Sequence, residues 1–269
     1  RGRAFAWCVS EDFDVDQDVD ALLGSADSAF LATNLRGGKF GDASASLGSF
    51  TGCAPAPLAA DYDGDARPDL WSSTGGGALY LGKPSGVFAQ DPSYVGPALP
   101  ALAARGGGEF FGLRALQAVD LDFDGALDLV WSKAAPEGQH LRGQFAPGFA
   151  QRKGLDAPTK LTAPAALIAD LDGDQVWDLI ALGEHGVEVQ RGGAKANNAL
   201  RLGLLGKKDN RRGIGAVVEV VAQRVYRRIY WRGEATLVGV GGEKEVDVVR
   251  ITWPNGVVQA EFDRDADQV

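Results

Sequence analysis

Aspartate recurs at alternate positions of one short stretch, Asp170-Leu171-Asp172-Gly173-Asp174-Gln175-Val176-Trp177-Asp178. Carboxylates stand at positions 1, 3, 5 and 9 of this nine-residue loop, and an apolar run follows at residues 179–182. A hard cation such as Ca²⁺ binds roughly six to eight oxygens at about 2.3–2.6 Å, so closely spaced carboxylates in a tight loop suit it. The stretch therefore predicts a calcium-binding loop.

The same pattern occurs four times, in loop 1 (residues 12–20), loop 2 (61–69), loop 3 (120–128) and loop 4 (170–178). We expect up to four Ca²⁺ ions, one in each loop. The expected carboxylate ligands are Asp12, Asp14, Asp16, Asp20, Asp61, Asp63, Asp65, Asp69, Asp120, Asp122, Asp124, Asp128, Asp170, Asp172, Asp174 and Asp178. Position 7 is expected to add a backbone carbonyl, from Asp18, Arg67, Ala126 and Val176.

An EF-hand also begins with aspartates at positions 1, 3 and 5, but it needs a bidentate Glu at position 12 and flanking helices. Position 12 is Leu23, Ser72, Trp131 or Ala181 in the four loops, and the flanking runs are typical of strands. The EF-hand interpretation is therefore excluded.

The loops begin at residues 12, 61, 120 and 170, so the repeat lengths are 49, 59 and 50 residues. Periods of this length are typical of propeller blades or stacked arrays. Short apolar runs precede the loops (residues 4–7, 58–60, 116–119 and 166–169) and follow them (21–23, 70–71, 129–131 and 179–182). Short runs separated by glycine-rich turns favour strands. We expect an all-β fold of propeller blades, with residues 99–112 as an inserted loop or short helix.

The repeat ends after Arg191, and residues 197–269 read as a separate, sandwich-like β unit. Strand-like runs lie at residues 199–204, 216–221 and 246–251, and Asn255-Gly256 predicts a hairpin turn. The expected domains are therefore a repeat domain at residues 1–196 and a C-terminal domain at residues 197–269.

Composition and charge narrow the function. The formal net charge is −9, and four Ca²⁺ ions would bring it to about −1, so the acidity serves mainly as counter-charge for metal. Negative overall charge disfavours nucleic-acid binding.

No stretch is long and apolar enough to span a bilayer. The chain begins with Arg1 and contains no Met, which predicts a mature or truncated product. Cys8 and Cys53 form either one disulfide or two free thiols.

Basic and aromatic residues gather in one part of the C-terminal unit. They are Arg224, Tyr226, Arg227, Arg228, Tyr230, Trp231 and Arg232. Such a cluster suits an acidic partner or a sugar, but a solvated strand face is the favoured interpretation.

The loops and their following strands resemble the FG-GAP or VCBS repeat of integrin-like β-propellers. Asn34-Leu35-Arg36-Gly37-Gly38-Lys39-Phe40 is similar to that family's outer-strand motif, with Arg36 in place of the first Gly. This resemblance implies blades in which the loop joins two strands and binds Ca²⁺. Such propellers usually have seven blades, so the four repeats form either a small propeller or, as we favour, part of a longer one. Loop 1 departs from the family pattern at Gln17 and Asp18.

The C-terminal unit is similar to the ASPIC/UnbV domain. The shared motifs are Asn198-Ala199-Leu200, Asn210-Arg211-Arg212-Gly213-Ile214-Gly215-Ala216, Val240-Gly241-Gly242 and Trp253-Pro254-Asn255-Gly256. The two resemblances together place the chain near the cartilage acidic protein family and its bacterial relatives.

Two functions follow from these patterns. The favoured one is a calcium-stabilised scaffold or adhesion-type protein, exported to the extracellular space, cell surface or periplasm, that binds a protein or glycan and belongs to a larger assembly. The alternative is a propeller hydrolase or lyase that acts on polysaccharide. The chain has two histidines, His140 and His185, in separate repeats, and no G-x-S-x-G motif, so a catalytic constellation is hard to assemble and we expect no enzyme.

Overall fold

The structure is a computed structural model, and it describes residues 4–54, 56–74, 77–94, 116–133, 139–145, 156–161, 166–183, 186–193, 197–207 and 210–266. The described residues form twenty-one strands and one short 3-10 helix, η1 (Ser44–Leu47). The predicted all-β fold is therefore confirmed. The predicted insertion at residues 99–112 lies outside the described residues.

Four antiparallel sheets, the blades, follow one another along the chain, and in each the strands pair in chain order. Blade 1 contains β1 (Trp7–Glu11), β2 (Asp20–Gly24), β3 (Ala29–Asn34) and β4 (Phe40–Asp42). Blade 2 contains β5 (Leu58–Ala60), β6 (Asp69–Ser72), β7 (Ala78–Gly82) and β8 (Phe88–Gln90). Blade 3 contains β9 (Leu116–Val119), β10 (Asp128–Lys133), β11 (Gln139–Phe145) and β12 (Asp156–Leu161). Blade 4 contains β13 (Ala166–Ala169), β14 (Asp178–Gly183) and β15 (Gly186–Gln190).

Each aspartate loop joins the first two strands of its blade. In every blade the first strand ends one residue before position 1, and the second strand begins at the aspartate of position 9. The two strands are hydrogen-bonded neighbours, so the loop must turn back within nine residues. The strand predicted at residues 4–7 lies further along the chain, since β1 begins only at Trp7 and ends at Glu11. Before β1, the amide of Ala6 donates one hydrogen bond to the Gly24 carbonyl (2.7 Å).

Apolar side chains from neighbouring blades interlock to form the core. One cluster joins blades 1 and 2 and includes Val9, Leu22, Leu31, Leu70 and Phe88. A second cluster joins blades 2 and 3 and consists of Leu58, Tyr62, Trp71, Leu79, Leu127 and Leu129. The innermost strands β1, β5 and β9 contact one another in sequence. A blade therefore buries its apolar faces against its neighbours, as expected for repeats that cannot form a core alone.

The C-terminal residues form two further sheets. A two-stranded sheet pairs β16 (Asn198–Leu202) with β19 (Thr236–Gly241). A four-stranded sheet has the order β18 (Val225–Tyr230), β17 (Val217–Ala222), β20 (Glu245–Thr252) and β21 (Val258–Asp265). A core of Val218, Val220, Trp231, Val240 and Ile251 fills the space between them. Asn255-Gly256 lies in the turn between β20 and β21, as predicted, and Gly256 has the positive φ that this turn requires.

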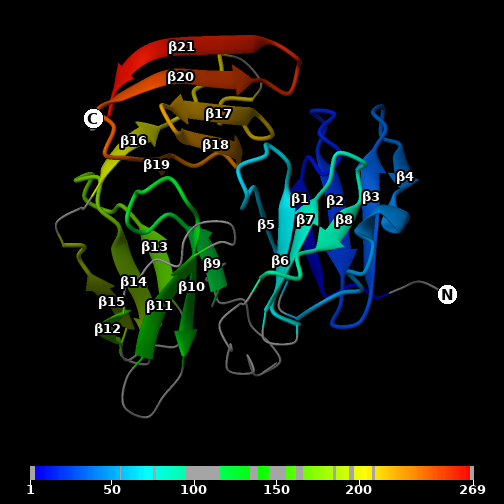
Figure 1. Ribbon diagram of the computed structural model, residues 1–269, viewed down its shortest axis with the longest axis horizontal. Helices are drawn as coiled ribbons and strands as arrows, with labels where there is room; N and C mark the ends of the chain where they lie inside the picture. The colour runs from blue at the N-terminus through cyan, green and yellow to red at the C-terminus, as the bar shows by residue number, and fades with distance from the viewer. Residues whose placement is uncertain are drawn as a thin grey trace.

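The C-terminal sheets lie across one end of the blades (Figure 1). The aspartate loops are at that end: loop 1 contacts β18, loop 3 contacts β18, β19 and Asn197, loop 4 contacts β16, and Asp61 of loop 2 lines a cavity together with β18. Both cysteines are free thiols: Cys8 is exposed and Cys53 is buried. No helix among the described residues is long and apolar enough to cross a membrane.

Candidate metal centres and the interface that covers them

Three aspartates converge in each loop, those at positions 1, 3 and 9. In all four loops each of these residues offers one carboxylate oxygen that lies within 4.8 Å of the other two. The four groups are Asp12, Asp14 and Asp20; Asp61, Asp63 and Asp69; Asp120, Asp122 and Asp128; and Asp170, Asp172 and Asp178. Carboxylate oxygens at this separation form a donor set for a hard divalent cation.

The backbone of every loop turns left-handed at positions 4 and 6. Loops 2, 3 and 4 each place one glycine at these positions, beside Ala66, Phe123 or Gln175, all of which have positive φ. Loop 1 has no glycine at either position, yet Val15 (φ 62°) and Gln17 (φ 74°) adopt the same left-handed conformation. A β-branched residue in this region is strained.

Backbone amides hold the aspartates of positions 1 and 9 in place. The position 9 carboxylate accepts a hydrogen bond from the amide of position 2 in all four loops, at 2.8–3.0 Å. In loops 1, 2 and 4 the other oxygen of this carboxylate accepts a hydrogen bond from the amide of Asn34, Gly82 and Gly192, respectively. Each donor either ends the third strand of its blade or follows it closely. For Asp128, the corresponding position along the chain lies outside the described residues. These bonds orient the carboxylates before any ion binds.

Positions 5 and 7 shape the turn. The position 5 carboxylate accepts a hydrogen bond from the position 7 amide in each loop, at 2.8–2.9 Å. The four pairs are Asp16 with Asp18, Asp65 with Arg67, Asp124 with Ala126, and Asp174 with Val176. The position 5 aspartate does not belong to the converging group of positions 1, 3 and 9. Its role as a metal ligand, and that of the position 7 carbonyl, stays a prediction.

Burial and crowding make loops 1, 2 and 3 electrostatically costly, and in loop 1 burial and the neighbouring aspartates raise the pKa of Asp14 to about 6. Burial raises the pKa of Asp69 to about 7 and that of Asp61 to about 6, with repulsion from Asp63 adding to both. In loop 3, burial raises the pKa of Asp120 and of Asp128 to about 7. Such shifts mean that the ionised loop lacks enough positive charge nearby.

The donor set fits calcium on these observations. All the converging side-chain atoms are hard oxygens, and the carboxylates are buried, crowded and held by backbone amides. A bound divalent cation would supply the missing counter-charge and would join the first strand of a blade to the second.

Arginines of the C-terminal sheet lie directly over the loops. Arg228 of β18 donates a hydrogen bond to Asp12 Oδ2 (2.9 Å) and pairs with Glu11 (3.6 Å), and all three side chains are at least 95% buried. Arg232 also pairs with Glu11, at 3.3 Å. Burial raises the pKa of Glu11 to about 7, although both arginines lower it. The favoured interpretation of the basic cluster as a solvated face is therefore wrong for Arg228, whose acidic partner is blade 1.

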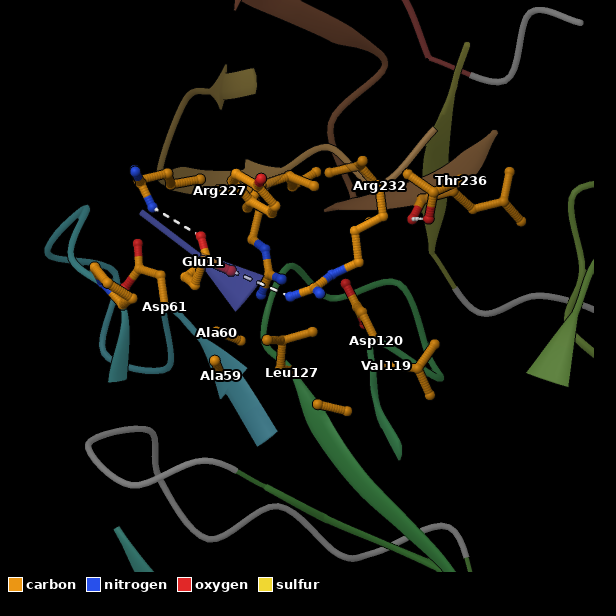
Figure 2. A pocket seen from close by; sticks show the side chains of 18 of the residues that line it. Glu11, Ala59, Ala60, Asp61, Val119, Asp120, Leu127, Arg227, Arg232 and Thr236 are labelled. Atoms are coloured by element: carbon orange, nitrogen blue, oxygen red, sulfur yellow. Dashed lines mark hydrogen bonds and ion pairs between the residues drawn. The ribbon is translucent and has the colours of Figure 1, made fainter. Parts of the chain in front are cut away.

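A cavity of about 200 Å³ separates the C-terminal sheets from blades 1, 2 and 3. Figure 2 shows Arg227 and Arg232 above it, with Glu11, Asp61 and Asp120 below. Arg227 donates a hydrogen bond to the carbonyl of Gly125 (3.2 Å) and interacts electrostatically with Asp120 and Asp61, the position 1 residues of loops 3 and 2. The positive charge of one arginine therefore acts on the carboxylates of two loops.

Loop 3 is enclosed from several sides. Trp177 of loop 4 stacks on Phe123, with ring centroids 5.6 Å apart, and its indole N–H donates to the carbonyl of Asp120 (2.6 Å). The Asn197 side chain donates to the carbonyl of Asp122 (2.8 Å), and the amide of Gly241 donates to that of Phe123 (2.8 Å). The C-terminal unit thus fixes the backbone of loop 3.

Gly239 of β19 lies so close to loop 3 that it must lack a side chain. A Cβ at this position would lie 2.1 Å from Asp120 Oδ2 and 2.5 Å from the backbone of Phe123. This contact could not be predicted from the sequence, because it joins residues more than a hundred positions apart.

Residues 12–72 match the family model of the FG-GAP-like repeat. The match covers loops 1 and 2 and supports an FG-GAP repeat propeller, with blades as predicted. No curated protein matches the chain. Among solved structures, the chain is similar to one described as the basis of specific recognition of non-reducing terminal N-acetylglucosamine by an Agrocybe aegerita lectin, with 18% identity and a TM-score of 0.47. That match covers 94% of this chain, which spans 65% of the lectin chain.

Proposed function

We propose that this protein is a calcium-stabilised propeller scaffold that binds a protein or glycan partner. The observation that carries the proposal is the fourfold repetition of one converging carboxylate group at the same place in each blade. Each ion would join two strands, and ions that bind only the folded state add directly to its stability.

The position of the loops favours a structural role for the metal over presentation to a ligand. In loops 1, 2 and 3 the position 1 aspartates lie beneath the C-terminal sheets, and those of positions 1 and 9 are buried. A partner would therefore meet other surfaces of the blades or the outer face of the C-terminal unit. The ASPIC/UnbV identity of that unit, with export to the extracellular space, cell surface or periplasm, is part of the same proposal.

We further propose that the protein is not an enzyme. Among the described residues, Glu11 is the carboxylic acid outside the loops whose pKa is raised most, and it is buried and paired with Arg228 and Arg232 at the interface. Hydrogen bonds from backbone amides hold the carboxylates of the converging aspartates within their own loops.

A binding screen tests the proposal. The purified protein is applied to a glycan array and to immobilised candidate proteins, in calcium and after removal of calcium with EGTA. We expect a ligand that binds in calcium and is lost in EGTA, because the blades loosen without metal. Turnover of a polysaccharide, abolished by substituting one acid outside the loops, would contradict the proposal and favour the polysaccharide enzyme.

A further inference from the structure

Arginines are distributed unevenly over the four loops. In loop 1, Arg228 binds the position 1 carboxylate of Asp12 at 2.9 Å, and the exposed Arg36 pairs with Asp18. In loop 4, Arg201 lies 3.9 Å from Asp170, the position 1 residue. Arg191 pairs with the position 3 carboxylate of the same loop, Asp172.

Loops 2 and 3 differ in this respect. Among the described residues, no arginine or lysine forms an ion pair with a carboxylate at position 1, 3 or 9 of either loop. Arg227 lies near both loops, but its hydrogen bond goes to a backbone carbonyl, that of Gly125. Position 3 is also better shielded here, since Asp63 and Asp122 are half-buried whereas Asp14 and Asp172 are exposed.

A guanidinium on a ligand oxygen opposes metal binding for two reasons. It occupies lone pairs that the ion would use, because charge-assisted hydrogen bonds are short and strong. It also repels the ion, and a single charge about 5 Å from a divalent cation lowers its affinity roughly tenfold even in a water-like dielectric. Loop 1 has a further disadvantage, because Val15 and Gln17 strain its backbone.

We propose that loops 2 and 3 are the tight metal sites of this protein and that arginines hold loops 1 and 4 as weak sites. Loops 1 and 4 thus have an arginine within ion-pair distance of a ligand carboxylate, whereas loops 2 and 3 share only the more distant charge of Arg227 and depend more on an external cation. The inference rests on the proposed binding of calcium and adds to it a ranking of the four loops.

Calorimetric titration of the EGTA-stripped full chain with Ca²⁺ tests the ranking. We expect two tight binding steps and weaker steps with affinity at least about tenfold lower. Asp63→Asn and Asp122→Asn should each remove one tight step, whereas Asp14→Asn and Asp172→Asn should leave both. Four equal steps, or loss of a tight step in either of the last two variants, would overturn the ranking while leaving calcium binding intact. No binding at all would overturn both the ranking and the proposed function.

The effect of an arginine can be isolated at loop 4. Arg191 is exposed, so Arg191→Gln should leave the fold intact and raise the affinity of the loop 4 step by about tenfold. Arg212→Gln is the matched control, because Arg212 is an exposed arginine that pairs with Glu234 (3.7 Å) away from the loops. Equal affinities in the two variants would contradict the role assigned to Arg191.

Discussion

Replacing Arg228 by methionine should destabilise the protein more than any exposed arginine substitution. Arg228 joins residues 216 positions apart in the sequence, since its guanidinium binds Asp12 Oδ2. Methionine retains most of the apolar stem that packs at the interface. The substitution therefore removes mainly the charge, and it leaves Asp12 and Glu11 buried with less compensation.

The size of the effect follows from the burial of all three groups. Removing one partner of a buried ion pair costs about 3–5 kcal/mol. Arg232 still pairs with Glu11 at 3.3 Å, so we expect the lower end, about 3 kcal/mol. For a chain of this size 1 kcal/mol corresponds to about 2–4 °C, which gives a loss of roughly 6–12 °C in melting temperature.

Differential scanning calorimetry in EGTA provides the assay, since no metal then compensates Asp12. Arg250→Met is the control, because Arg250 is exposed and pairs with Glu219 on the neighbouring strand. Exposed pairs contribute about 0–1 kcal/mol, so the control should melt within about 4 °C of the original protein. If Arg228→Met melted no lower than Arg250→Met, the C-terminal sheet would not be docked on blade 1 in solution.

Three further predictions concern packing, backbone strain and the thiols. Gly239→Ala should lower the melting temperature by several degrees, because its Cβ would overlap Asp120, whereas Gly242→Ala, with open space around it, should not. Val15→Gly should raise the stability of the calcium-free protein by about 1 kcal/mol in urea unfolding, through relief of the left-handed backbone; no gain would show that loop 1 is relaxed. Cys8 should react with a thiol reagent in the native protein, while Cys53, buried and with its pKa raised to about 11 by burial, should react only after unfolding; equal rates would refute this burial.

The sequence was sufficient to predict the elements around each loop. Alternating aspartates followed by an apolar run placed β2, β6, β10 and β14 directly after the loops, since the position 9 aspartate of each loop is also the first residue of a strand. The Asn255-Gly256 turn was predictable for a similar local reason, because few residues accept a positive φ.

The interface could not be predicted, because it depends on contacts between distant segments. The pattern of Arg227 and Arg228 on β18 is also that of a solvated strand face, and only the docking of the C-terminal sheet distinguishes the two. The difference between the loops in their arginine contacts could not be predicted from the sequence for the same reason. Asp61 and Asp170 occupy equivalent positions in the repeat, yet Arg201 of β16 approaches only the second.

If metal ions hold the blades together, thermal unfolding in calcium and in EGTA should show it most directly. At a free calcium concentration of about 100 times Kd, each occupied site adds about 2.7 kcal/mol to the free energy of unfolding. Two tight sites should therefore raise the melting temperature by about 10–20 °C over the EGTA value. Identical melting curves in calcium and in EGTA would contradict the account.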